Sequence, residues 1–394
     1  MSSNDVVIAG SARTPMGGMM GDLSSVRSPD LGAASIKAAI ERSGLQPADI
    51  QEVIMGCVLP GGLGQAPARQ ASRASGIPDS SGCTTVNKMC GSGMQAVIMA
   101  HDQIKAGTNS IMIAGGMENM SQAPYLLPKA RAGMRMGHGQ VMDSMFLDGL
   151  EDAYEGSLMG VFAQRTADKY DISREAADAF AVRSHQNAAR AWAEGRFDEQ
   201  LVPVEIPQRR GDPVVFARDE GFREDASMDT LGKLRAIDGK RDADAIVTAG
   251  NASQQNDAAA ACLVVAEDKV EELGLEPILW FHSWSAAGCD PSRMGIGPVP
   301  AVERLFAKTN MGWDDIGLIE LNEAFAPQAL AVLKGWGFTE DDSRRELVNV
   351  NGSGISLGHP IGATGIRILA DMAHEMQRRE VRYGLETMCI GGGQ

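Results

Sequence analysis

Cys90 is the residue of this sequence that is best placed to act as a nucleophile. It lies in VNKMCGSGMQA (86–96), where an apolar stretch gives way to small residues and then to an expected helix. The positive end of that helix and the backbone N–H groups before it would favour a thiolate, and the flanking glycines would leave room for a substrate. Most free cysteines, however, are small buried packing residues. From this stretch alone, both interpretations stay open.

His359 is the best of the six histidines as a candidate acid or base. It lies between Gly358 and Pro360, in a glycine-rich loop ahead of GATGIRILA. Loop histidines are usually solvated, but this loop corresponds to that of Cys90 in an internal repeat described below. A histidine so placed is more typical of a functional residue than of a surface residue.

Two further motifs carry polar groups at the ends of expected strands. Cys389 lies in ETMCIGGGQ, where backbone N–H groups of the three glycines could bind a developing oxyanion. Asn322 and Glu323 lie in LNEAFA, between a strand and an apolar helix. Taken alone, Cys389 is interpreted as a packing residue and Asn322 as a helix cap.

Strands and helices alternate through the first third of the chain and would place Cys90 at a strand-to-helix turn. Strands are predicted to begin at residues 5, 52, 83 and 110, and helices are predicted over 28–44, 66–76 and 93–107. Such alternation predicts a parallel sheet that helices cover on both faces.

The alternation stops between residues 122 and 248, which predicts an inserted loop domain with a long helix at 174–195. The last part of the chain repeats the first in the order and spacing of its elements, because VNGSGISLGHPIGATG corresponds to VNKMCGSGM and ETMCIGGGQ to IMIAGGMEN. We therefore expect an N-terminal half at 1–121 and a C-terminal half at 249–394, whose first strand would lie near 246–266. Both copies would contribute residues to one shared cleft.

Composition excludes several classes of protein. The chain has 394 residues, 44% of them hydrophobic, and 36 Lys and Arg against 51 Asp and Glu give a net charge of -15. This charge repels nucleic acid and anionic membrane surfaces. The sequence shows no secretory signal, no apolar run that could span a membrane and no CxxC pair among six cysteines. We expect a cytoplasmic protein with reduced thiols, no metal site and no nucleotide-binding phosphate loop.

Taken together, six blocks of this sequence resemble the thiolase family in order and over essentially the whole chain. They are VNKMCGSGMQA, GGMENMS, TAGNAS, NEAFA, GHPIGATG and CIGGGQ. The resemblance implies an α/β thiolase fold, with two duplicated halves in a five-layered α-β-α-β-α arrangement and an inserted loop domain. Among thiolases, the chain is most similar to biosynthetic members that condense two acetyl-CoA molecules into acetoacetyl-CoA.

The resemblance also implies a role for each candidate residue. Cys90 would attack the thioester and carry the acetyl group, and His359 would take its proton. Cys389 would then remove a methyl proton from a second acetyl-CoA, whose enolate oxygen His359 and a water oriented by Asn322 would hold. The N–H groups of Cys90 and Gly391 would form a second oxyanion site. Coenzyme A thioesters are the substrates, and no cofactor is implied.

Further residues match the family's substrate-binding positions. Arg223 corresponds to an arginine that stacks on adenine, Ser253 to a pantetheine contact, and Leu150 lies along the same arm. Met159 and Met294 correspond to methionines that line a short acyl pocket. The family forms homo-oligomers, so we expect a tetramer here, with a dimer as the alternative.

Three departures from the family pattern bear on these expectations. Leu158 stands where short-chain members commonly carry histidine, and GSGISLGHP replaces the commoner GGAIALGHP. The sequence ends at Gln394, where the family usually continues through a short strand, so we expect either that this sequence is truncated or that the sheet edge beside Cys389 is incomplete.

Two alternative functions stay open. One is a degradative 3-ketoacyl-CoA thiolase that acts on longer chains, and the other is a non-catalytic relic that binds acyl-CoA. A decarboxylating ketosynthase is disfavoured because Asn322 stands where that enzyme needs a second histidine.

Overall fold

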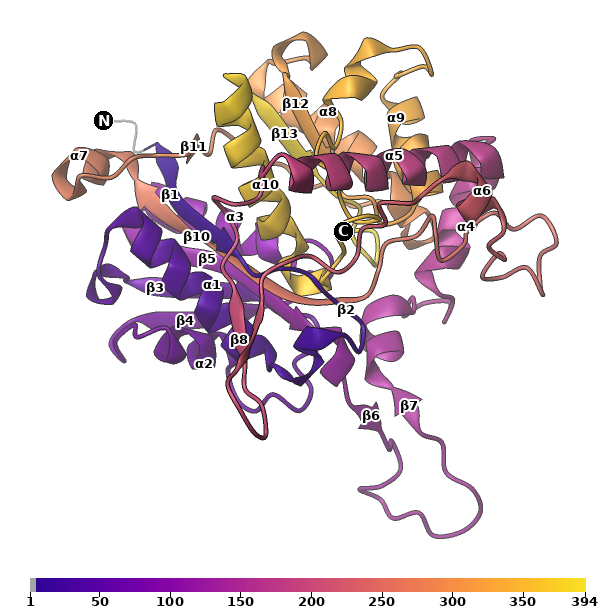
Figure 1. Cartoon of the computed structure of the whole chain (residues 1–394), viewed down its shortest axis with the longest axis horizontal. Helices are drawn as coiled ribbons and strands as arrows, with labels where there is room; N and C mark the ends of the chain where they lie inside the picture. The colour runs from indigo at the N-terminus through magenta and orange to yellow at the C-terminus, as the bar shows by residue number, and fades with distance from the viewer. Residues whose placement is uncertain (1–4) are drawn as a thin grey trace.

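The computed structural model describes residues 5–394 and contains one large mixed sheet and a smaller C-terminal sheet (Figure 1). The large sheet has the strand order β11-β1-β10-β5-β3-β4, and β2 pairs with β10. Its strands are β1 (Val6–Arg13), β2 (Gly17–Gly18), β3 (Glu52–Gly56), β4 (Gly82–Val86), β5 (Ile111–Asn119), β10 (Asn256–Ala266) and β11 (Leu279–Trp280). All four strands that were predicted in the first third of the chain therefore form, and they lie in this sheet.

The prediction of a parallel sheet is only partly right. β3 runs parallel to β4 and to β5, as alternating strands and helices require. β10 runs antiparallel to both β1 and β5. It enters the sheet from the long middle segment rather than through a short crossover helix, so the βαβ rule does not fix its direction.

β10 also corrects the expectation that a strand near 246–266 begins the C-terminal half. It lies in the middle of the N-terminal sheet, paired with β5 from Asp257↔Asn119 to Val265↔Ile111. Its residues are buried and alternate between two apolar clusters, one on each face of the sheet. Small alanines in this strand let helices approach closely on both sides.

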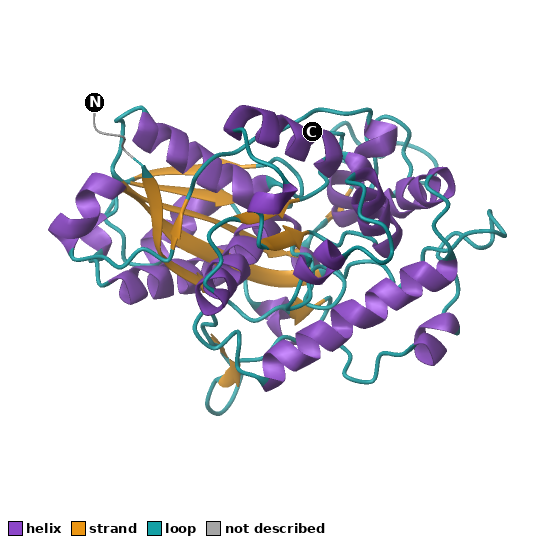
Figure 2. Ribbon diagram, turned by 90° about the horizontal axis from the view of Figure 1, so that it is seen from above, coloured by secondary structure: helices purple, strands orange, loops and turns teal. Residues whose placement is uncertain are grey.

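Helices cover the large sheet on both faces, and the helices on its inner face also cover the second sheet (Figure 2). α1 (Ser28–Ser43) and α2 (Pro67–Ala74) lie on the outer face, while α3 (Ser92–Lys105) and α10 (Thr364–Arg379) lie between the two sheets. As predicted, α1 ends at Gly44, which adopts a left-handed conformation with φ 79°.

The second sheet consists of two parallel strands, β12 (Leu318–Leu321) and β13 (Gly384–Thr387). Leu318 packs toward α3 and α10, whereas Ile319 and Leu321 pack toward α9 (Ala326–Gly335). α8 (Pro298–Thr309) joins the outer layer, and α7 (Val270–Leu273) is a short helix near β11. The layers therefore follow the five-layered order of the thiolase fold.

The middle segment has little sheet of its own. It contains two small hairpins, β6 with β7 and β8 with β9, and the helices α4 to α6. The bounds are β6 (Tyr125–Leu126), β7 (Met142–Asp143), α4 (Met159–Lys169), α5 (Arg174–Ala193), β8 (Val204–Ile206), β9 (Val214–Phe216) and α6 (Met228–Gly232). The long predicted helix is α5, and the hydroxyl of Ser173 caps it by accepting from the N–H of Ala176 at 3.1 Å. Among residues 5–394, no helix has the length and apolar character needed to cross a membrane.

Candidate active site

Loops from the two halves meet at Cys90 and Cys389. Cys90 lies between β4 and α3, and Cys389 follows β13. The loops pack so closely that a Cβ atom added to Gly91 would lie 2.5 Å from Cδ1 of Ile390. The backbone N–H of Gly391 forms a hydrogen bond with the Cys90 thiol. The two sequence copies thus contribute to one site.

The turn that carries Cys90 is sharp. Met89 adopts a left-handed conformation with φ 48°, which is unusual for a residue with a side chain. The Ser92 hydroxyl secures the turn, because it donates to the carbonyl of Met89 at 2.6 Å and accepts from the N–H of Lys88 at 2.8 Å. Strained turns of this kind are typical of positions where a side chain must be presented to a substrate.

The protonation state of Cys90 differs from the one expected. Burial raises the pKa of its thiol to about 11, although the N–H groups of Gly391 and of Cys90 itself lower it. Removal of the sulfur from water therefore outweighs the nearby N–H groups and the helix end, and the prediction of a favoured thiolate is wrong. The neutral thiol is therefore the resting form near pH 7, and a nucleophilic Cys90 would need a base.

Hydrogen bonds to the backbone and to the ring of His359 hold this residue in place. Its backbone N–H donates to Oδ1 of Asn256, at the start of β10, at 2.9 Å. Its Nδ1 lies 2.6 Å from the hydroxyl of Thr364, and that hydroxyl donates its proton to the carbonyl of Pro360 at 3.0 Å. Nδ1 must then carry the ring proton and donate it to Thr364, which leaves Nε2 as the acceptor.

The environment of His359 also keeps the ring neutral. The side chain is buried, and burial, followed by the charge of Arg367, lowers its pKa to about 3. A neutral imidazole at physiological pH is able to act as a base.

We expect the ring nitrogens of His359 to show no titration between pH 5 and 8. The lowered pKa means that the imidazole is deprotonated throughout this range. Nitrogen NMR of the labelled protein would check this, with the His359→Asn protein used to assign the signal. A transition near pH 6.5 in the assigned signal would contradict the prediction.

Cys389 lies in a small apolar cluster beside Cys90. It is 1% exposed and packs with Met294 and Ala324, with Met159 at the edge of the cluster. Burial, followed by the neighbouring Cys90, raises the pKa of its thiol. A thiolate formed at Cys389 would consequently be strongly basic, as removal of a proton from carbon requires.

Asn322 is buried without a hydrogen-bond partner for its amide. Its backbone N–H donates to the carbonyl of Thr387 at 3.0 Å, but neither amide atom has a partner among residues 5–394. It does not cap α9, whose N-cap residue is Phe325. Because buried amides are almost always satisfied, this one is suited to bind a water or a substrate oxygen.

The predicted substrate-binding residues lie at three places around this centre. Leu150 packs in the same apolar cluster as Cys90. The N–H of Ser253 donates to the carbonyl of Ala324 at 2.9 Å, next to the cluster of Cys389. Arg223 is exposed and lines a surface groove of about 570 Å³ together with Arg218. The groove is also lined by five carboxylates, and Arg218 pairs with Glu224 at 2.6 Å, so Arg223 is the guanidinium that it offers to a phosphate group.

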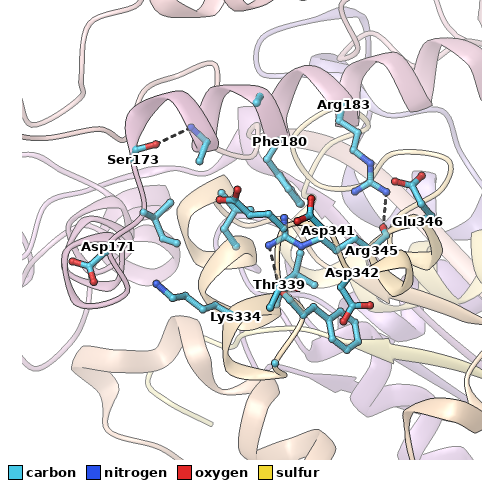
Figure 3. Close-up of a pocket in the computed structure, with 18 of the residues that line it drawn as sticks. Asp171, Ser173, Phe180, Arg183, Lys334, Thr339, Asp341, Asp342, Arg345 and Glu346 are labelled. Atoms are coloured by element: carbon cyan, nitrogen blue, oxygen red, sulfur yellow. Dashed lines mark hydrogen bonds between the residues drawn. The ribbon is translucent and has the colours of Figure 1, made fainter.

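A larger cavity of about 970 Å³ lies away from all of these residues, between α5, α9 and the loop at 337–346 (Figure 3). Its lining includes six carboxylates and three cationic side chains. The carboxylates are those of Asp171, Glu175, Glu340, Asp341, Asp342 and Glu346. A polyanionic ligand such as coenzyme A would be repelled here.

Three buried residues that support the site were not singled out from the sequence: Asn256, Thr364 and Glu118. A carboxylate at the end of the apolar strand IMIAGGMEN was a usable signal for Glu118, because a buried charge requires specific partners. Asn256 and Thr364 gave no comparable signal, since asparagine and threonine are common in loops and at helix ends.

Comparison with known proteins gives a consistent assignment for the whole chain. Residues 6–268 match the family described as "Thiolase, N-terminal domain", and residues 275–394 match "Thiolase, C-terminal domain". The chain is 48% identical over 391 residues to an acetyl-CoA acetyltransferase of Chromobacterium violaceum, covering 99% of this chain and 97% of that protein. It is 49% identical over 389 residues to an acetyl-CoA acetyltransferase of Cupriavidus necator, with the same coverage. The crystal structure of the Bacillus anthracis acetyl-CoA acetyltransferase matches with a TM-score of 0.94 at 40% identity, covering 99% of this chain and 96% of that one.

Proposed function

This chain belongs to the thiolase family, and from that premise we propose that it catalyses the reversible condensation of two acetyl-CoA molecules to acetoacetyl-CoA and CoA. The observation that carries the proposal is the meeting of the Cys90 and Cys389 loops, one from each half of the chain, in a single site. His359 and Asn322 provide the polar groups that the reaction needs.

In the first step, Cys90 attacks the carbonyl carbon of acetyl-CoA. Nε2 of His359 accepts the thiol proton, which then leaves with the CoA thiolate as CoA–SH. The product is an acetyl group on Cys90. The raised pKa of Cys90 and the lowered pKa of His359 make the neutral pair the resting state, so the proton moves as the bond forms.

In the second step, the Cys389 thiol gives its proton to Nε2 of His359, and the resulting thiolate removes a proton from the methyl group of a second acetyl-CoA. The enolate oxygen is stabilised by the Nε2–H of the His359 imidazolium and by a water on the Asn322 amide. The enolate carbon attacks acetyl-Cys90, the N–H groups of Cys90 and Gly391 hold the new oxyanion, and Cys90 leaves as a thiolate that recovers its proton from Nε2 of His359. The thioester itself acidifies the methyl group and supplies the leaving group, so these steps need no cofactor.

Substrate binding follows from the same arrangement. Arg223 would hold the nucleotide end of coenzyme A in the groove that it lines, and Ser253 would contact the pantetheine chain. Leu150 would lie along that chain near Cys90. Met159 and Met294, packed beside Cys389, would leave room for a short acyl group only.

We expect turnover to fall as the ketoacyl chain lengthens. Acetoacetyl-CoA should be cleaved by CoA at least about 10-fold faster than a ketoacyl-CoA longer by four carbons, because additional methylenes would overlap the packed methionines. Thiolysis rates measured with both substrates would test this. Equal or faster cleavage of the long substrate would instead identify the degradative 3-ketoacyl-CoA thiolase.

Self-association and location are also part of the proposal. The hairpin of β6 and β7 and the loop between its strands project from the body (Figure 1) and expose the apolar side chains of Tyr125, Met136 and Val141. Such a surface supports a homo-oligomer, with a tetramer as the expected state and a dimer as the alternative. Because Cys90 and Cys389 must stay reduced, a cytoplasmic location fits this chemistry.

A further inference from the structure

Glu118 is a buried carboxylate that joins the two halves of the site. It is 0% exposed and lies next to the end of β5. One oxygen, Oε2, accepts from the N–H of Val58 and from the N–H of Gly362, each at 2.9 Å. The other oxygen, Oε1, accepts from the N–H of Leu59 at 3.0 Å. A single side chain thus connects the loop after β3 with the turn that follows His359.

Both of these segments lead directly to the reacting groups. Val58, Leu59 and Ile361 pack in the same apolar cluster as Cys90. Gly362 lies between His359 and Thr364 in the sequence. The hydroxyl of Thr364 is hydrogen-bonded to Nδ1 of His359. Any movement of Gly362 would therefore move the imidazole relative to the Cys90 sulfur.

Gly362 is packed so tightly that a side chain at this position would clash with its neighbours. A Cβ atom on this glycine would lie 2.7 Å from Oε2 of Glu118 and 3.0 Å from Cα of Cys57. Its carbonyl oxygen lies so close to β3 and β5 that a Cβ atom on Gly56 or on Gly116 would meet it at 2.5 Å or 2.0 Å. The turn after His359 therefore rests directly on the N-terminal sheet, with Glu118 as its polar anchor.

On this basis, and resting on the proposed function, we propose that Glu118 is a positioning residue for catalysis, which fixes His359 against Cys90 by holding Gly362 and the 58–59 loop on one carboxylate. Charge-assisted bonds of this kind are stronger than bonds to a neutral acceptor. Burial raises the pKa of Glu118 to about 7, while the N–H groups of Val58, Leu59 and Gly362 lower it. The pH of the experiment is therefore set at 8, above this pKa.

The test is the rate at which iodoacetamide alkylates Cys90 at pH 8, followed by mass spectrometry of the peptide that contains Cys90, because Cys83 and Cys289 are also half-buried free cysteines. Glutamine at position 118 keeps the shape of the side chain but has one oxygen, and its NH₂ group would face an N–H donor. We expect Glu118→Gln to slow alkylation by about 10- to 100-fold, because small misplacements of a catalytic group have effects of this size. His359→Asn should slow it by about 100-fold.

The double variant makes the test specific for positioning. If Glu118 acts through His359, Glu118→Gln should slow alkylation no further in a His359→Asn background. Equal slowing in both backgrounds would overturn the proposal, as would an unchanged rate in Glu118→Gln alone. An unchanged rate in His359→Asn would instead contradict the role of His359 in the proposed function, so the two failures are distinguishable.

Two further variants distinguish a loss of positioning from a general loss of folding. Gly362→Ala would push the same turn away from Glu118 and Cys57, and we expect it to slow alkylation only when His359 is present. An unchanged rate in this variant would also overturn the proposal. Glu375→Gln is the matched control, since Glu375 is equally buried but pairs with Arg196, Arg378 and Arg379 instead of the site. It should alkylate at the parental rate.

Discussion

The Cys90→Ala protein is expected to form no acetyl adduct when it is incubated with acetyl-CoA. Without the sulfur there is no nucleophile for the first step, and condensation and thiolysis should both fall on the order of 10⁵-fold. Intact mass spectrometry of the parental protein should show the gain of one acetyl group, and the variant should show none. Cys90 is a half-buried residue in a loop, so removal of its sulfur should leave the fold intact.

Cys83→Ala provides the matched control for this experiment. Cys83 is also a free, half-buried cysteine, and it lies on β4 outside the site. Its variant should gain the acetyl group as the parental protein does. Tight binding of acetyl-CoA by the parental protein without any adduct would instead favour a non-catalytic acyl-CoA-binding relic.

The Cys389→Ala protein should separate the two steps of the reaction. Cys90 and His359 remain, so the acetyl adduct should form, and labelled CoA should exchange into acetyl-CoA at close to the parental rate. Formation of acetoacetyl-CoA should fall by about 10³- to 10⁴-fold, because the base that removes the methyl proton is absent. Exchange and condensation assays on the same preparation would measure both effects.

Cys262→Ala is the control for loss of a buried cysteine. Cys262 lies on β10 and is fully buried, but it packs between the helices and the sheet, away from Cys389. Its variant should keep both activities. If Cys389→Ala lost exchange and condensation together, Cys389 would be required for the first step as well, and the division of roles proposed here would be wrong.

The residues of the site that could be predicted from the sequence are those with a local signal. Cys90 and His359 lie beside glycines in loops that the internal repeat places in equivalent positions, and Cys389 lies beside glycines at the end of an apolar strand. The pKa of Cys90 could not be predicted in this way, because it depends on burial by residues from both halves. Glu118 was missed for a related reason, since its partners Val58 and Gly362 are distant from it in the sequence.

For the fold too, features with a local sequence signal could be predicted, whereas features that depend on contacts between remote segments could not. The helix at 28–43 begins and ends at residues that are typical of helix boundaries, and its prediction was right. The prediction that β10 belongs to the C-terminal half was wrong, because the sequence of a buried apolar strand does not indicate which sheet it will join. Pairing with β1 joins segments about 250 residues apart, as in Val6↔Ala266, and only the folded chain reveals it.

The position of β10 has a consequence for how this protein is made. A ribosome would synthesise about two thirds of the chain before this strand emerged, and until then β1 and β5 would each expose an unpaired edge. Pairing between such remote segments is slow, so the nascent chain would need protection from aggregation during translation.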